Sequence, residues 1–237
     1  DGRRNRTVIA VDVRKTLTAK TADIFLQVEP NSDFEVLTAL RALTNGASLE
    51  GDTFGGVPRS QLAQAAEALR GAKYGVILFG MGLTMSSGCQ HNVYQALMLA
   101  RDLNDYTAFA VIPMRGHGNV AGAEAVMTWL TGYPFAVNFS RGYPRYSPGE
   151  FSAVDLLARG EADAALVVAS DPAATFPAVA SARLRQIPMV VVDPQFSTTA
   201  QVAQVYIPSA TAGIAASGTA YRMDGVPLPL RRLVDSE

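Results

Sequence analysis

The sequence has 237 residues, of which 49% are hydrophobic and 17% charged. A chain of this kind can bury a sizeable core in one large domain or two small lobes, which excludes an intrinsically disordered protein. The formal net charge is -1 and no run of Lys and Arg stands out, which argues against a nucleic-acid partner.

The first predicted elements are a buried strand and two helices. Thr7–Val11 is a continuous apolar, β-branched run that ends at Asp12, which is typical of a strand covered on both faces. Asp33 is the predicted N-cap of the first helix, and Asn45-Gly46 ends it. Pro58 begins the second helix, whose apolar side chains recur on one face.

Short apolar runs and helical segments then alternate along the chain. Strands are predicted at Tyr74–Phe79, Ala108–Ile112, Ala164–Ala169 and Met189–Val192, and a helix around Val93–Leu103. This alternation predicts right-handed βαβ units and a mostly parallel sheet, which binds ligands at the carboxyl ends of its strands. All these runs are too short to span a membrane.

The segment Pro113–Glu150 differs, because it is rich in Gly, Arg and Tyr. Ala121–Leu130 is expected to be helical and the rest to be a long ordered loop. Loops of this length in compact domains usually bind a ligand or form protein–protein interfaces.

Two segments of the chain echo each other. Val11-Asp12, Thr18-Ala19 and Ala22 match Val192-Asp193, Thr199-Ala200 and Ala203, and a short apolar strand follows each set. An Asp at the end of a buried parallel strand can accept hydrogen bonds from the N–H edge of a purine or from ribose hydroxyls. The alternative, which a single echo with few identities favours, is that both Asp residues only cap the turn that follows.

The echo resembles the two guanine-binding turns of the molybdopterin-dinucleotide oxidoreductases, at Val8–Ala19 and Val190–Ala200. Phe79–Gly88 resembles the family's Gly-x-Gly loop, and Ser170–Pro177 its Gly-x-Asn-Pro turn, with Asp171 in place of the Asn. Ile207–Gly225 resembles its closing segment.

That resemblance implies an α/β fold with mostly parallel sheets in two pseudo-related Rossmann-like lobes, as in domains II and III of these enzymes. The lobes would be residues 1–122 and 123–237, the second with the long Gly/Arg/Tyr loop, and they can interleave. The implied pterin-dinucleotide crevice consists of Asp12, Thr18, Gly80, Gly82, Asp171, Asp193 and Thr199.

Within that family, Pro113–Gly122 and Thr131–Glu150 resemble the B subunit of formylmethanofuran dehydrogenase. Arg115 matches an active-site arginine of the dehydrogenase. The chain departs from the dehydrogenase pattern in its cysteines. It has only Cys89, so neither the four-cysteine [4Fe–4S] motif nor the cysteine or selenocysteine that binds tungsten or molybdenum is present, and the His that follows that ligand is also absent.

The expected protein is therefore a cofactor-free, non-catalytic B subunit of the bacterial formyltransferase/hydrolase relative. Such complexes move a formyl group from formyl-tetrahydromethanopterin to a methanofuran-like carrier and release formate. The molybdopterin guanine dinucleotide, the W/Mo ion and the [4Fe–4S] cluster would be lost. Hydrolase, transferase and a further structural subunit would be its partners, with zinc in a partner subunit, and the complex would be cytoplasmic and bind neither nucleic acid nor membrane.

Individual residues outside the crevice also suggest roles. Arg115 and His117 could hold an oxygen and move a proton, but with no metal ligand in the chain we expect a relic, with no catalytic residue and no metal site. Arg141, Tyr143, Arg145 and Tyr146 could bind an acidic carrier tail, but an interface with another subunit is favoured because Tyr and Arg are enriched there.

Two other functions stay open. The chain could be part of a catalytic dehydrogenase B subunit whose N-terminal part lies outside these 237 residues, and Cys-x-x-Cys spacing upstream would show this. It could also be a nucleotide-binding module that uses the crevice alone.

Overall fold

The computed structural model describes residues 5–235, which belong to two compact units, Asp1–Arg115 and Gly116–Glu237. Each unit combines helices with small sheets, so the predicted α/β class is confirmed. The predicted lobe boundary at residues 122/123 lies inside helix α6 (Val120–Thr131), which the structure keeps whole in the second unit. No helix of the described residues is long and apolar enough to cross a membrane.

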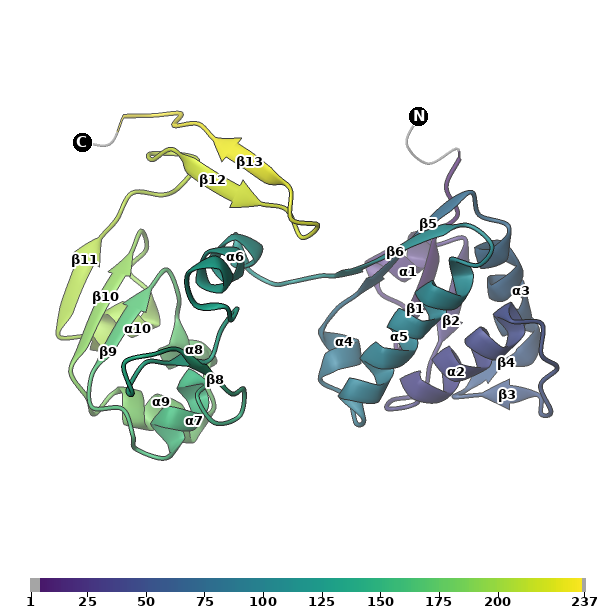
Figure 1. Cartoon of the computed structure of the whole chain (residues 1–237), viewed down its shortest axis with the longest axis horizontal. Coiled ribbons are helices and arrows are strands. Elements are labelled where there is room, and N and C mark those ends of the chain that lie inside the picture. Colours follow the sequence, from purple (N-terminus) through teal and green to yellow (C-terminus); the bar gives the residue numbers. More distant parts are fainter. Residues whose placement is uncertain (1–4, 236–237) are drawn as a thin grey trace. The chain divides into compact units, whose positions relative to one another are not determined.

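Unit 1 is drawn in purple to teal in Figure 1. Its elements are β1 (Ile9–Asp12), α1 (Leu17–Thr21), β2 (Ile24–Gln27), α2 (Asp33–Thr44), β3 (Thr53–Phe54), β4 (Val57–Pro58), α3 (Arg59–Arg70), β5 (Tyr74–Phe79), α4 (Met81–Thr84), α5 (Cys89–Leu103) and β6 (Ala108–Pro113). β1 pairs with β2 and β5 with β6, both in parallel, whereas β3 and β4 form an antiparallel pair. The predicted helix starts were each one residue off, since Ser32 is the N-cap of α2 and Pro58 that of α3.

The core of unit 1 lies between its parallel strands and three helices. Leu26 of β2 is fully buried there, together with Leu40 of α2, Leu62 of α3 and Leu103 of α5. The apolar side chains of α3 are spaced by three or four residues, so that one face of the helix turns to this core.

Gly75 of β5 lies where a larger residue has no room. A Cβ added at this position would come within 2.1 Å of the Phe109 ring on the neighbouring strand β6. Gly75→Ala is therefore expected to lower the free energy of unfolding of unit 1 by about 1–3 kcal/mol, because the ring must leave its place in the core. Chemical denaturation of Gly218→Ala, in a strand where the added Cβ meets nothing within 4 Å, is the control. Equal stability of both variants would contradict the prediction.

Unit 2 continues from teal to yellow in Figure 1. Its elements are α6 (Val120–Thr131), β7 (Val137–Asn138), β8 (Arg145–Tyr146), α7 (Ala153–Ala158), β9 (Ala165–Val168), α8 (Pro172–Thr175), α9 (Ala178–Leu184), β10 (Met189–Asp193), α10 (Thr198–Val202), β11 (Val205–Pro208), β12 (Gly218–Tyr221) and β13 (Pro227–Leu230). β10 lies between β11 and β9 in a parallel sheet, and β7–β8 and β12–β13 are antiparallel pairs.

The core of unit 2 lies on one face of this three-stranded sheet. Val167, Met189 and Val191 pack there against Leu157 of α7 and Leu184 of α9. The prediction of mostly parallel sheets is correct for β1–β2, β5–β6 and β11–β10–β9, whereas β3–β4, β7–β8 and β12–β13 are antiparallel pairs.

Asn119 joins distant parts of unit 2. It has a left-handed backbone (φ 59°) just before α6. Its side chain donates a hydrogen bond to the carbonyl of Thr219 (3.0 Å) and accepts one from the N–H of Tyr221 (2.8 Å), across 100 and 102 residues. The hairpin β12–β13 is thereby attached to the start of α6.

Candidate functional site

The turn after β1 is organised by side chains that accept backbone hydrogen bonds. Asp12 ends the strand, and its Oδ1 accepts a hydrogen bond from the N–H of Arg14 at 3.2 Å. Thr16 then caps helix α1, because its hydroxyl accepts the N–H of Ala19 at 3.3 Å. The chain returns through β2, which pairs with β1 in parallel.

The turn after β10 repeats this arrangement residue by residue. Oδ1 of Asp193 accepts the N–H of Gln195 at 2.7 Å, and Ser197 caps α10 by accepting the N–H of Ala200 at 3.3 Å. The return strand β11 pairs with β10 in the register that β2 has with β1. Each residue of the second segment follows its equivalent in the first segment by the same number of positions, so neither copy has an insertion.

The repeat extends to the first residue of each segment. The N–H of Val8 donates to the Asp23 carboxylate at 2.8 Å, and at the equivalent place the N–H of Met189 donates to the Gln204 side chain at 2.6 Å. The predicted echo is thus a structural repeat. One oxygen of each strand-end Asp caps its turn, as the alternative explanation for these residues proposed.

In unit 2, Asp171 ties two neighbouring turns together. Its Oδ1 accepts hydrogen bonds from the Thr199 hydroxyl (2.6 Å) and N–H (2.8 Å), and its Oδ2 accepts the N–H of Thr198 (3.2 Å). The Thr199 hydroxyl in turn accepts the N–H of Ala173 (2.9 Å), and Thr199 is completely buried. Burial alone would raise the pKa of Asp171, but these hydrogen bonds hold it below its ordinary value. Asp171 and Thr199, two of the predicted crevice residues, therefore bind each other.

Unit 1 has a different acidic group near its turn. Burial raises the pKa of Asp33 above its ordinary value, and the charge of Asp12 adds to the rise, whereas hydrogen bonds from its own backbone and from Ser86 oppose it. Ser86 also accepts a hydrogen bond from the buried Asn92 side chain at 2.9 Å. The sequence predicts Asp33 only as a helix cap, since its proximity to Asp12 and Ser86 depends on the tertiary fold.

The other predicted residues of the first turn and the Gly-x-Gly loop are less enclosed. Thr18, the equivalent of Thr199, is exposed. Gly80 is the N-cap of the short helix α4, which contains Gly82. A Cβ added at Gly82 would meet nothing within 4 Å, so the structure shows no close approach that requires glycine there.

The two turns differ strongly in charge. Arg14, Lys15 and Lys20 of the first turn correspond to Gln195, Phe196 and Gln201 of the second. All three basic residues are exposed, which suits a phosphate-bearing ligand. The second turn has a buried acceptor, Asp193, but none of the three equivalent residues in that turn is positively charged.

The predicted pair Arg115 and His117 lies at the junction of the units. Arg115 is the last residue of unit 1 and His117 the second residue of unit 2, and both are exposed. His117 has a left-handed backbone, with φ of 66°.

The predicted interface residues form part of a structured loop. The Arg145 guanidinium lies 4.7 Å from the centre of the Phe151 ring, and Tyr146 stacks on Tyr133 at 5.2 Å. Arg141 and Tyr143 are exposed on the same loop. The structure thus leaves Arg141, Tyr143 and Tyr146 exposed, and Arg145 and Tyr146 also hold the loop through their ring contacts. Among the described residues, no group of three or more His, Cys, Asp or Glu could hold a metal ion.

Known proteins resemble the chain over nearly its whole length, although no family model matches it. The B subunit of tungsten-containing formylmethanofuran dehydrogenase 2 from Methanocaldococcus jannaschii is 52% identical over 99% of the chain and 54% of its own length. The B subunit of the formyltransferase/hydrolase complex Fhc from Methylorubrum extorquens is 34% identical over 47% of the chain and 30% of its own length.

A solved structure is similar as well. A chain in the crystal structure of the Methylorubrum extorquens FhcABCD complex with methylofuran superposes with a TM-score of 0.65 and 26% identity, covering 85% of this chain and 52% of that one. The chain spans about half the length of the tungsten-containing relatives that it matches.

Proposed function

Because the chain belongs to the family of formylmethanofuran dehydrogenase B subunits, we propose that it acts in a multisubunit one-carbon enzyme as the cofactor-binding part of a dehydrogenase B subunit. The observation that carries this proposal is the 52% identity to a tungsten-containing enzyme over 99% of the chain. The formyltransferase/hydrolase relative matches less than half of the chain, at 34% identity. The dehydrogenase part, the first of the two other functions that the sequence leaves open, is thereby favoured.

The donors and acceptors of the two repeated turns fit the nucleotide ends of a pterin dinucleotide cofactor. In each unit a carboxylate, Asp12 or Asp193, ends a parallel strand and caps its turn with one oxygen, and its other oxygen would accept N–H groups of a purine. The exposed Arg14, Lys15 and Lys20 would neutralise phosphate groups at the first turn. The two pseudo-related Rossmann-like lobes expected from the sequence would carry these turns, and the equal register of β1–β2 and β10–β11 supports this part of the proposal.

The described residues of this chain do not form a binding site for the metal ion of such a cofactor. Cys89 is the single thiol of the sequence, and the described residues contain no cluster of metal-binding side chains. The donor set of this chain therefore fits the nucleotide ends of the cofactor and not the tungsten or molybdenum ion. When bound, the cofactor would supply the redox chemistry that the relatives' name describes, and this chain would bind and orient it.

The second candidate is the structural, cofactor-free subunit of a formyltransferase/hydrolase complex, with zinc in a partner subunit. The superposition on a chain of the FhcABCD complex favours it. The hydrogen bond from Thr199 to Asp171 favours it as well, because these two predicted crevice residues bind each other and not a ligand. In that case the complex would act on formyl carriers in the cytoplasm, and Arg141 and Tyr143 would contact another subunit.

One measurement separates the two candidates. The complete subunit, purified in its native complex, is analysed for tungsten and molybdenum by mass spectrometry and for pterin by fluorescence after oxidation. We expect about one metal ion and a stoichiometric amount of pterin per subunit. Asp12→Ala and Asp193→Ala should each lower the pterin content several-fold, with Asp163→Ala, an exposed acid outside the turns, as the control. A wild-type subunit without pterin would instead establish the structural role.

A further inference from the structure

The segment between β5 and α5 is held mainly by polar contacts. It consists of the short helix α4 and the loop of residues 85–88. None of the residues of α4 is buried, and the side chains of Met81 and Met85 are 67% and 76% exposed. Segments with few buried apolar contacts open more easily than the core. The position of this segment therefore depends on the hydrogen bonds of its loop.

Asn31, in the connection between β2 and α2, contacts this loop. Its Oδ1 accepts a hydrogen bond from the N–H of Ser87 at 3.0 Å, across 56 residues of the chain. Asn31 has a left-handed backbone, with φ of 66°, which side chains other than Asn and Asp rarely adopt. Such positions persist where surrounding contacts hold them, and they are common at functional sites. We call Asn31, Asp33, Ser86 and Ser87 the latch.

Ser86 connects the latch to α5. Its hydroxyl is hydrogen-bonded to the Asp33 carboxyl group and accepts a hydrogen bond from Nδ2 of Asn92 at 2.9 Å. Asn92 is 1% exposed and also donates to the carbonyl of Ser87 at 3.3 Å. Its Oδ1 is buried and has no hydrogen-bond partner among the described residues. A buried acceptor without a partner costs free energy, which opening of the loop would relieve by admitting water.

The charge of Asp33 adds a second cost to the closed loop. Burial raises the pKa of this carboxyl group, and the charge of Asp12 at the end of β1 raises it further. From α5, His91 reaches the same end of α2, where its ring lies 6.2 Å from that of Phe34. A carboxyl group kept where its charge is disfavoured, beside a turn that can bind a ligand, is typical of a functional role.

We propose that the latch holds the loop of residues 85–88 closed beside the first turn, and that a purine nucleotide bound at Asp12 leaves after the latch opens. Asn31 and Asp33 are then positioning residues, because they act on the ligand through the loop. This inference rests on the proposed function, since it takes the first turn as the nucleotide site. It adds a step, opening of the latch, that sets how long the ligand stays.

Closure of the latch should weaken as the pH rises. Opening returns Asp33 to water and to its ordinary pKa, whereas burial and Asp12 raise the pKa in the closed latch. The stabilisation of the closed loop is therefore complete below the ordinary value and is lost as the pH rises through the raised value. Asp33→Asn keeps an oxygen acceptor for Ser86 without the charge, so it should remove this pH dependence.

Hydrogen–deuterium exchange of the complete subunit in its complex tests the latch. The readout is the exchange of residues 81–86, which leaves out Ser87, because its N–H bonds Asn31 directly. At neutral pH Asn31→Gly, which keeps the left-handed backbone but loses the acceptor, should raise this exchange about fivefold. Asp33→Asn should lower it about twofold. Glu35→Gln, which removes an exposed charge two residues further along α2, is the matched control and should change nothing.

Release of the ligand is the second readout. The pterin that stays on the subunit is followed over time by fluorescence after oxidation. Asn31→Gly should release it about threefold faster than the wild type, and Asp33→Asn should release it more slowly. A wild type without pterin would contradict the proposed function, and release of added guanosine diphosphate would then be measured in its place.

Several outcomes would overturn the inference. Unchanged exchange of residues 81–86 in Asn31→Gly would do so, as would an equal rise throughout unit 1, because a latch acts on one segment. A looser loop with unchanged release of pterin or guanosine diphosphate would mean that the ligand leaves without it. An unaltered pH dependence in Asp33→Asn would remove Asp33 from the latch, and a subunit that binds neither ligand would contradict both proposals. Opposite effects of the two substitutions would support the latch, because a purely structural contact predicts loosening in both.

Discussion

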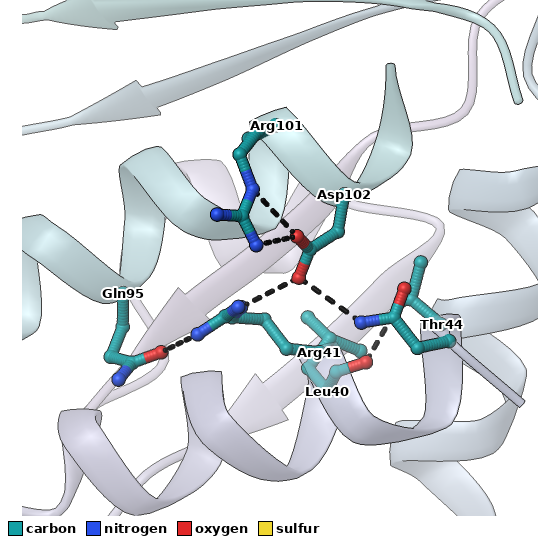
Figure 2. A network of polar contacts seen from close by, with 7 residues as sticks. Leu40, Arg41, Thr44, Gln95, Arg101 and Asp102 are labelled. Atoms are coloured by element: carbon teal, nitrogen blue, oxygen red, sulfur yellow. Dashed lines mark hydrogen bonds and ion pairs between the residues drawn. The ribbon is translucent and has the colours of Figure 1, made fainter. Parts of the chain in front are cut away.

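Replacing Asp102 with Asn is expected to lower the free energy of unfolding of unit 1 by about 3–5 kcal/mol. Asp102 of α5 is buried and receives hydrogen bonds from Arg41 (2.8 Å) and Asn45 (3.1 Å), which belong to α2 and its C-cap. Figure 2 shows that the same Arg41 reaches Gln95 on the facing helix, at 2.6 Å. Loss of the carboxylate charge leaves the mostly buried Arg41 without its counter-ion, at the contact of α2 with α5.

The control for this variant is Arg101→Gln. Arg101 also donates to Asp102, at 2.7 Å, but its side chain is 65% exposed. Exposed ion pairs contribute little, so the control should cost about 1 kcal/mol or less. Urea denaturation followed by circular dichroism measures both variants, and a similar loss in the two would refute the role given to the buried Arg41–Asp102 contact.

The pH dependence gives a second measurement of the same contact. Burial alone would raise the pKa of Asp102, but hydrogen bonds from Arg101, Arg41 and Asn45 together hold it below its ordinary value. A carboxyl group with a lowered pKa stabilises the fold fully above its unfolded-state pKa, about 3.9, and this stabilisation is lost as the pH falls through the folded-state value. The difference between wild type and Asp102→Asn should therefore be constant near neutral pH and shrink in acid.

Asp171→Ala is expected to destabilise unit 2 by about 2–3 kcal/mol. The substitution removes the acceptor of three hydrogen bonds and leaves the Thr199 N–H, in a fully buried residue, without its partner. Because the pKa of Asp171 is lowered in the fold, this contribution is also present at neutral pH and lost in acid. Thermal unfolding of the variant beside Asp163→Ala, an exposed acid before β9, measures the effect.

A cofactor-binding assay adds a functional result for Asp171. The turn that Asp171 holds also carries Asp193, so the variant should lose bound pterin in the complete subunit together with its stability. Asp171→Asn keeps one acceptor oxygen and should lie between the wild type and Asp171→Ala. Full stability of Asp171→Ala would mean that the two turns keep their places without this carboxylate.

The longer strands could be predicted from the sequence because their apolar runs are continuous. Tyr74–Phe79 was predicted with the bounds that β5 has, and Met189–Val192 lacks only the last residue of β10. The hairpin β12–β13 was missed, since Pro227 and Pro229 argue against a strand by local rules. Its antiparallel pairing depends on partners that no local pattern reveals.

The candidate site was predictable only where its residues are close in the sequence. The strand-end residues Asp12 and Asp193 were recognised because each follows an apolar run and precedes a Thr-Ala turn. The contacts of Asp33 with Ser86 and of Asp171 with Thr199 join residues far apart in the chain, so composition and spacing contain no sign of them. The structure places both pairs beside the repeated turns.

The attachment of the hairpin to Asn119 has a consequence for the order of folding during synthesis. Strand β2 meets β1 after fifteen residues, whereas Asn119 must wait until residues 219 and 221 have left the ribosome. Until then α6, whose only buried residue is Gly122, has no hairpin to pack against. Trp129 of α6, the single tryptophan of the chain, contacts Tyr221 at 6.5 Å between ring centres. Its fluorescence therefore reports the step in which the hairpin packs against α6.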